Sequence, residues 1–312
     1  MKSIIFVHKG NPRYLGLAIN QARIFNPNCD IILLGDDSNK SVEGACHFAI
    51  NDYMKDANEF NNIFFNVSPN RRSYELFCFQ RWFIIRDFFK SHPQYDDDFL
   101  YCDSDTLLYT DATYALDKMT DYLLATEAWE SPGFSFFKKG TLDDFCKTIT
   151  WMYSSLEGLT TVKYYANEFE HNDLLQGISD MTAFLHYSTK KRSGKCLDAQ
   201  IPSTLWRNDK RLSCYDHNIN MPDGFLTDMW NRKKIQFHDG MPYCRNEKTG
   251  ENVLFNGLHF QGDAKYLMIK YQSTTRLNLT LLVEFIRGYL TYRLKIAIRW
   301  WLDRRGLSLR KK

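Results

Sequence analysis

The chain has 312 residues, of which 44% are hydrophobic and 25% are charged, a balance that fits one large or two small globular domains. Its eight cysteines form no C-x-x-C pair, which argues against a zinc cluster and a thioredoxin-type site. No stretch reaches the roughly 18 apolar residues of a membrane span, and the first apolar run is too short for a signal peptide core. We therefore expect a cytoplasmic protein with reduced thiols.

A strand, a helix and a second strand open the chain. Residues 3–8 are β-branched and aromatic, and apolar residues then recur at positions 15, 19, 22 and 25, at helical spacing. Residues 29–35 form a second buried strand that ends at two acids, Asp36 and Asp37. This order favours a parallel sheet with helices on its faces. We predict an α/β fold with a Rossmann-like, mostly parallel central sheet flanked by helices.

The next elements lead to a second acidic site. Residues 74–90 form a strongly apolar helix, and residues 99–102 form a strand that ends in an acidic turn at 103–105. In open α/β sheets, ligands bind outside the carboxyl ends of the strands, so residues 36–37 and 103–105 should share one crevice. The later pattern predicts strands at 122–129 and 133–140, one helix over 141–157 and a short helix that begins at Asp180. Residues 188–256 are expected to be rich in loops, with short strands such as residues 233–238.

The C-terminal segment has a different character from the rest. Residues 287–312 carry nine Lys or Arg and one acid, whereas the net charge of the whole chain is only +3. We expect one domain over residues 1–272 and a basic amphipathic helical tail over residues 273–312. Its apolar positions recur at helical spacing: Val283, Ile286, Leu290, Leu294, Ile298 and Trp301. Residues 276–312 either pack on the domain or lie on an anionic membrane surface; no recognition motif indicates nucleic acid.

The central motif is D-x-D, formed by Asp103, Ser104 and Asp105 directly after an apolar strand. Two carboxylates this close repel each other unless a cation lies between them. Hard oxygen ligands suit Mg²⁺ or Mn²⁺. Such an ion bridges phosphate oxygens and neutralises the charge on a departing nucleoside diphosphate.

A second motif, H-x-x-G-x-x-K, lies far downstream. The imidazole of His259 can be a third metal ligand beside the two carboxylates. Gly262 allows the backbone to approach a phosphate closely, and Lys265 supplies a positive charge to it. We expect these residues to join the D-x-D site.

Together the two motifs resemble those of nucleotide-sugar glycosyltransferases of the GT-A fold, and the closest pattern is that of family 8, the relatives of glycogenin. The resemblance implies that Asp103, Asp105 and His259 hold Mn²⁺ or Mg²⁺ and that Lys265 contacts the donor diphosphate. That family usually continues K-P-W after this lysine, whereas this chain has Lys265-Tyr266-Leu267.

Other positions match the same class more loosely. The first strand and the acids after the second strand stand where such enzymes hold the nucleobase and ribose. Arg81 resembles an upstream arginine that touches the donor, although a surface cation on a helix would look the same. Asp180 resembles a catalytic aspartate near the donor sugar, or it is a helix N-cap. The resemblance thus implies one catalytic residue, Asp180, and the donor-binding residues Phe6, Val7, His8, Asp36, Asp37, Arg81, Ser104, Gly262 and Lys265.

The hypothesis is therefore a metal-dependent hexosyltransferase that uses a UDP-sugar donor. Its acceptor would be a glycan or a lipid-linked glycan in bacterial surface polysaccharide synthesis, with the enzyme in the cytoplasm or peripheral on the inner face of the membrane. Retention of the anomeric configuration follows from family 8, and inversion follows if Asp180 is a general base. Two alternatives remain: an inactive sugar- or nucleotide-binding protein, and a phosphohydrolase of the haloacid dehalogenase type. The latter needs Thr or Val at position 107, where this chain has Leu107.

Overall fold

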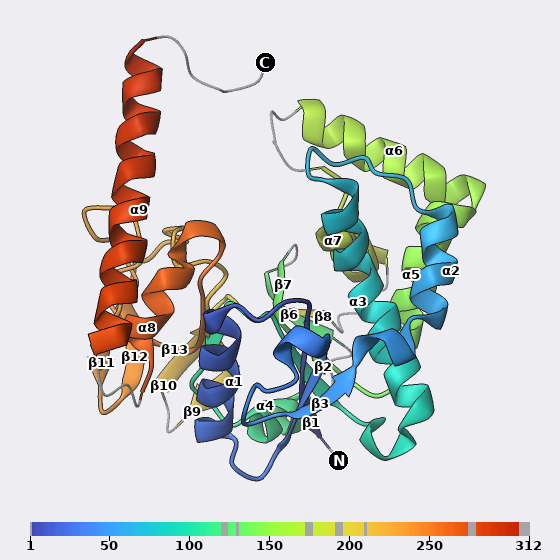
Figure 1. The fold of residues 1–312 in the computed structure, drawn as a ribbon, viewed down its shortest axis with the longest axis horizontal. Coiled ribbons are helices and arrows are strands. Elements are labelled where there is room, and N and C mark those ends of the chain that lie inside the picture. Colours follow the sequence, from blue (N-terminus) through green and yellow to red (C-terminus); the bar gives the residue numbers. More distant parts are fainter. Residues whose placement is uncertain are drawn as a thin grey trace.

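The computed structural model describes residues 2–119, 124–128, 131–171, 177–190, 196–208, 211–273 and 279–305. Two sheets form its centre (Figure 1). The larger sheet has seven strands in the order β3-β2-β1-β4-β7-β6-β8. Four of its neighbouring pairs are parallel, and only the pairs that include β7 are antiparallel. In chain order its strands are β1 (Ser3–His8), β2 (Asp30–Gly35), β3 (Cys46–Ala49), β4 (Phe99–Cys102), β6 (Leu124–Ala128), β7 (Ser131–Phe137) and β8 (Cys196–Asp198).

Four of the six strands in the smaller sheet come from the last third of the chain. Its strands run in the order β11-β12-β13-β10-β9, and the short strand β5 from the first half of the chain pairs with β13. The bounds are β5 (Thr106–Leu108), β9 (Ser203–Asn208), β10 (Arg211–Tyr215), β11 (Gln236–His238), β12 (Met241–Arg245) and β13 (Asn252–His259). Strand β5 therefore ties the smaller sheet to the end of β4 in the larger sheet.

Alternating side chains of β1 explain why the larger sheet has helices on both faces. Ile4 and Phe6 join one hydrophobic cluster, and Ile5 and Val7 join the other, because successive side chains of a strand point to opposite faces. The first cluster packs against α1 (Arg13–Phe25), α4 (Ala112–Lys118), α8 (Met268–Tyr271) and the smaller sheet. The second packs against α2 (Lys55–Ile63), α3 (Arg72–Ser91), α5 (Thr141–Ser154), α6 (Leu156–His171) and α7 (Asp180–Lys190). The predicted α/β fold with a mostly parallel, helix-flanked sheet is confirmed.

The expected single helix over 141–157 is wrong, because two helices cover this stretch and its continuation. Helix α5 ends at Ser154, and Ser155 has extended backbone angles before α6 begins at Leu156. Gly158 makes the sharp turn possible, since a Cβ there would lie 1.9 Å from the carbonyl oxygen of Trp151. The stretch over 188–256 contains short strands, as expected: strands β8 to β12 lie within it, and β13 begins in it.

The tail contains one long helix, α9 (Leu279–Arg304), which extends beyond the two sheets (Figure 1). Its middle packs on the rest of the chain: the backbone at Gly288 lies against Tyr266, and the guanidinium of Arg293 lies 4.8 Å from the ring centre of Trp230. In the described part of the chain, no helix is both long and apolar enough to cross a bilayer. The basic residues Arg310, Lys311 and Lys312 lie outside the described residues.

Candidate active site

Hydrogen bonds fix the backbone of the D-x-D turn where β4 ends. The N–H of Asp103 donates to the carbonyl of Gly133 at 2.8 Å. The carbonyl of Asp103 accepts from both the N–H and the Oγ1 of Thr106, at 3.2 and 2.7 Å. The N–H of Phe260 donates to the carbonyl of Asp105 at 2.9 Å. The two carboxylates therefore project from a backbone that is held on both sides.

The pairing of β5 with β13 brings the two motifs together. In this antiparallel pair His259 lies opposite Thr106, the residue that follows the second aspartate. The Nε2 of His259 is 3.3 Å from Oδ1 of Asp105. One ligand atom from each of Asp103, Asp105 and His259 can be chosen so that all lie within 4.8 Å of one another. The structure thus joins the three residues that the sequence suggested as metal ligands.

This donor set suits a hard divalent cation. The two carboxylates offer the oxygen ligands that Mn²⁺ and Mg²⁺ prefer, and the imidazole adds a nitrogen ligand of the type that most often binds metals in proteins. Ligand atoms about 2.1 Å from an octahedral ion lie at most about 4.2 Å apart, so small rotations of the side chains would close the observed cluster around one ion. Residues Asp103, Asp105 and His259 fit the metal that the motifs imply.

Arg81 of α3 holds the first aspartate. Its Nη1 donates to Oδ1 of Asp103 at 2.6 Å, and the hydroxyl of Tyr101 donates to the same oxygen at 2.5 Å. The Nε and Nη2 of Arg81 donate to Oδ2 of Asp180 at 3.1 and 2.5 Å, and the indole N–H of Trp82 donates to the same oxygen at 2.9 Å. Arg81 is therefore a buried bridge between Asp103 and Asp180, and not a surface cation of the helix.

The titration behaviour of this cluster follows from burial and charge. Burial alone would lower the pKa of Arg81, but Asp180, Tyr101 and Asp103 raise it well above its ordinary value. Burial raises the pKa of Asp180, and Arg81 and Trp82 only partly oppose this shift. Asp180 is 2% exposed and is also the first residue of α7. Its carboxylate is occupied by Arg81 and Trp82.

The second aspartate has different partners. The Nζ of Lys265 lies 3.0 Å from Oδ2 of Asp105, and the side chain of Lys265 is 34% exposed. Burial would raise the pKa of Asp105, but His259 and Lys265 outweigh it and hold this pKa well below its usual range. Gly262 has φ of 61°, a left-handed conformation that favours glycine, and it begins the 3₁₀ helix η4 (Gly262–Leu267) that carries Lys265.

Two of the expected donor-binding residues meet beside the D-x-D turn. The Nδ1 of His8 and the Oγ of Ser104 are 2.9 Å apart, which joins the end of β1 to the turn. The ring of His8 packs edge-on against Tyr14 of α1, with ring centres 5.9 Å apart. Burial and the neighbouring Lys265 lower the pKa of His8.

The other expected donor-binding positions are less directly connected to this turn. Asp36 accepts the N–H groups of Gly10 and Ser38, at 2.7 and 3.0 Å. Asp37 is exposed. The side chains of Phe6 and Val7 lie in the two hydrophobic clusters, so their backbone alone remains to contact a donor.

A buried ion pair between Lys233 and Asp216 holds the backbone of His259. The sequence analysis did not predict this pair. Oδ2 of Asp216 accepts the backbone N–H of His259 at 3.2 Å, and Nζ of Lys233 lies 2.8 Å from Oδ1 of Asp216. Neither side chain of this pair is exposed to solvent. Burial would lower the pKa of Lys233, but Asp216 and Asp223 outweigh it and raise this pKa. No local motif marks these residues; a lysine within a loop-rich stretch gives no sign that it is buried.

No protein-family profile and no curated protein matches the chain. Among solved structures, the galactosyltransferase LgtC with donor and acceptor sugar analogues is 12% identical; the match covers 91% of this chain and all of that one, with a TM-score of 0.43. Mouse xyloside xylosyltransferase 1 is 6% identical over 74% of this chain and 89% of its own, with a TM-score of 0.45.

The bifunctional glycosyltransferase WbbM also matches, with 12% identity, a TM-score of 0.45, and coverage of 90% of this chain and 51% of its own. These structural neighbours are glycosyltransferases. Their TM-scores lie below 0.5, and we take the function from the residues of the site.

Proposed function

We propose that this chain is a metal-dependent glycosyltransferase that moves a hexose from a UDP-sugar to a glycan or lipid-linked glycan acceptor, in bacterial surface polysaccharide synthesis. One observation carries the proposal: ligand atoms of Asp103, Asp105 and His259 lie within 4.8 Å of one another, at the carboxyl end of a strand in a mostly parallel sheet. That edge of such a sheet is where nucleotides bind. The pattern of family 8 supports the donor class.

Each residue of the site has a proposed part in binding the donor. Asp103, Asp105 and His259 would hold Mn²⁺ or Mg²⁺, which neutralises charge on the diphosphate leaving group. Lys265 pairs with Asp105 and is one-third exposed, so it can turn its ammonium group to a phosphate. His8 and Ser104, with the backbone of β1, face the nucleoside. Most of the rate enhancement then comes from positioning and from electrostatic stabilisation.

Asp180 is proposed to affect turnover through Arg81. Its Oδ2 accepts three N–H groups from Arg81 and Trp82, and Arg81 in turn contacts Asp103. Loss of the Asp180 charge would free the guanidinium and change the position of Asp103. Similarity to family 8 implies retention of the anomeric configuration, and a general base at Asp180 implies inversion.

The test is Mn²⁺-dependent hydrolysis of a panel of UDP-hexoses by the full chain, with and without EDTA. Asp103→Ala and Asp105→Ala should each reduce turnover by about 10³-fold or more while circular dichroism stays unchanged. The control is Asp52→Ala, which removes an exposed aspartate outside the site. Near-normal activity in both site variants would refute the metal site. Metal-dependent binding of UDP without any turnover would favour the inactive binding protein instead.

We also propose that α9 lies on an anionic membrane surface, which would bring the site to a lipid-linked acceptor. Six apolar side chains at helical spacing are exposed by 45 to 61%: Val283, Ile286, Leu290, Leu294, Ile298 and Trp301. Arg287 and Arg293 are exposed on the same helix. An exposed apolar stripe with flanking cations fits the boundary between headgroups and acyl chains, where each cation contributes about 1 kcal/mol.

Co-sedimentation with liposomes that contain acidic lipid tests this placement of α9. The double change Leu290→Gln and Leu294→Gln should abolish pelleting, and added salt should weaken the pelleting of the unmodified chain. The matched control is Leu156→Gln on α6, a leucine that is 82% exposed. Equal pelleting of all forms would show that α9 does not bind the membrane surface.

A further inference from the structure

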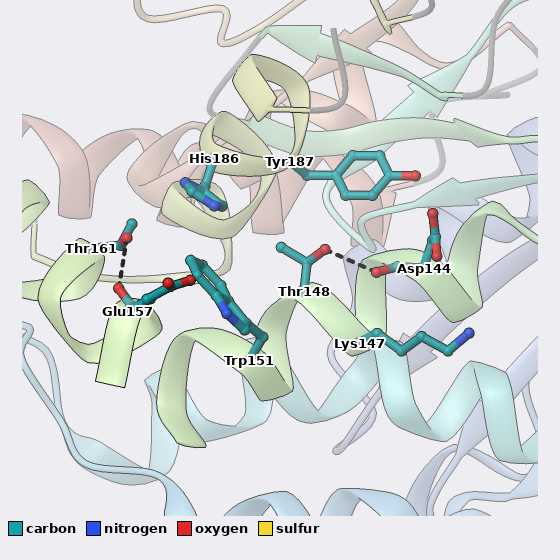
Figure 2. Close-up of a pocket in the computed structure, with 8 residues that line it drawn as sticks. All are labelled: Asp144, Lys147, Thr148, Trp151, Glu157, Thr161, His186 and Tyr187. Carbon is teal, nitrogen blue, oxygen red and sulfur yellow. Dashed lines mark hydrogen bonds between the residues drawn. The ribbon is translucent and has the colours of Figure 1, made fainter. Parts of the chain in front are cut away.

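Helices α5, α6 and α7 lie on the other side of the molecule from α9 (Figure 1). They line an open pocket of about 540 Å³ (Figure 2). None of its lining residues belongs to the D-x-D site. Helix α5 contributes four of them, and α6 and α7 contribute two each: Asp144, Lys147, Thr148, Trp151, Glu157, Thr161, His186 and Tyr187. A volume of this size is within the range of small-molecule sites.

The face of α5 that lines the pocket departs from ordinary helix packing. Asp144, Lys147, Thr148 and Trp151 follow one another at i, i+3, i+4 and i+7, so they share one face of the helix. On a helix between neighbours that spacing normally marks a closed apolar seam. Here the apolar seam lies elsewhere on α5, at Phe145, Ile149 and Met152, which are fully buried in the core. The face with Asp144, Lys147, Thr148 and Trp151 is mostly polar and lines the pocket.

An aromatic surface forms one wall. The rings of Trp151 and His186 are stacked, with centres 5.2 Å apart and planes inclined by 16°. Trp151 is only partly buried, and its indole N–H has no hydrogen-bond partner among the residues that the structure describes. Tyr187, which also lines the pocket, is only 1% exposed. The pocket thus offers an aromatic ring with an unused N–H donor.

Acceptors and charges complete the wall. The hydroxyls of Thr148 and Thr161 donate to backbone carbonyls, at 2.9 and 3.0 Å, and keep their lone pairs for a ligand. Lys147 is outnumbered by the carboxylates of Asp144 and Glu157, so the pocket has a slight negative balance. Phosphates and other anions are disfavoured by this balance, whereas the lysine disfavours a compact organic cation. A neutral ligand with many hydroxyl groups satisfies both conditions.

We propose that the pocket between α5, α6 and α7 binds a neutral saccharide ring, separately from the donor site. The C–H face of a sugar ring packs on an aromatic side chain, and its hydroxyls bond to the carboxylates and the ammonium group of the lining. Saccharide binding here is independent of the proposed transfer reaction. Helix α7 carries Asp180 at its start and His186 and Tyr187 about 9 Å further along its axis, so the two sites share one helix.

The test is saturation-transfer NMR on the full chain without donor, with a panel of neutral mono- and disaccharides that have gluco, galacto and manno rings and their N-acetylated forms. The strongest binder is then titrated by calorimetry. Trp151→Ala should weaken its affinity by about tenfold or more. Glu157→Gln keeps an exposed position exposed and should weaken it less. Trp301→Ala, which removes an exposed tryptophan of α9, is the matched control and should change nothing.

Two further arms separate this pocket from the active site. Asp103→Asn should leave the saccharide affinity unchanged, and Trp151→Ala should leave the hydrolysis of UDP-hexoses unchanged. The proposal is overturned if no saccharide of the panel binds, or if Trp151→Ala and Glu157→Gln both bind as tightly as the unmodified chain. It is also overturned if tetramethylammonium binds at Trp151 and the saccharides do not, because the pocket would then be a cation site.

Discussion

The two aspartates of the D-x-D motif lie two residues apart, yet they are held in different ways. Asp103 contacts Arg81, which is 8% exposed and is itself fixed by Asp180 and Trp82. Asp105 contacts Lys265, whose side chain is 34% exposed and whose ammonium group has no second carboxylate at ion-pair distance among the described residues. The first aspartate thus has a permanent cation and the second a replaceable one. One half of the site is held by buried contacts, and under the proposed function the other half would exchange partners when metal and diphosphate bind.

The largest expected difference between the two halves is in stability. Arg81→Met leaves the carboxylate of Asp180 buried without a cation, and this change should lower the free energy of unfolding by about 3–5 kcal/mol. Lys265→Met breaks a partly exposed ion pair and should cost less than about 1 kcal/mol. Urea unfolding of both variants without metal measures this. Equal losses would show that the two cations are held alike.

A second difference should appear in kinetics. Asp180→Asn removes the charge that anchors Arg81, and we expect kcat to fall by about 10–100-fold with little change in KM. Donor hydrolysis at varied UDP-sugar concentrations separates the two constants. An unchanged kcat would show that Asp180 has only a structural role at the start of α7.

Around Asp105, the loss of the metal ligand His259 and the loss of the phosphate contact Lys265 should have different effects on binding. His259→Ala should weaken Mn²⁺ binding by about tenfold or more, because a ligand is lost. Lys265→Ala should mainly weaken UDP binding, since it removes a charge and not a ligand. Calorimetric titration with Mn²⁺ and then with UDP distinguishes the two effects. Unchanged affinities in both variants would return these residues to purely structural roles.

The smallest expected effect is the dependence of folding stability on pH. The pKa of Asp105 is lower in the folded chain than its ordinary value of 3.8, because His259 and Lys265 outweigh burial. A lowered pKa in the folded state stabilises it above the unfolded pKa, and this stabilisation is lost as the pH falls towards the folded pKa. The difference in unfolding free energy between the unmodified chain and Asp105→Asn should therefore shrink as the pH falls below about 4. A difference that grows on acidification would contradict this.

Sequence was sufficient where the chemistry is local. The strand before Asp103 and the D-x-D spacing belong to one short segment, and the α/β fold follows from the strand–helix–strand order at the start of the chain. The sequence suggested Arg81 and Asp180 as site residues. It did not predict their direct contact, because they lie 99 positions apart.

Other features depend on contacts that no local pattern records. Lys233 is buried only because Asp216 and Asp223 come from neighbouring turns. The end of α5 is set by close packing at Gly158, which hydrophobic periodicity does not report. Periodicity likewise marked the apolar stripe of α9 but not its exposure to solvent.

The pairing of β5 with β13 has a consequence for the time at which the site appears. Asp105 and His259 are 154 positions apart, and they meet only through this pair of strands. A chain grows from its N-terminus and its domains fold during synthesis. While the ribosome is still adding residues before β13, the nascent chain already has both carboxylates of the D-x-D turn but neither the imidazole nor the lysine. The cluster of Asp103, Asp105 and His259 is therefore among the last features to be completed. If it holds the proposed metal, an unfinished chain would have little capacity to bind metal or nucleotide.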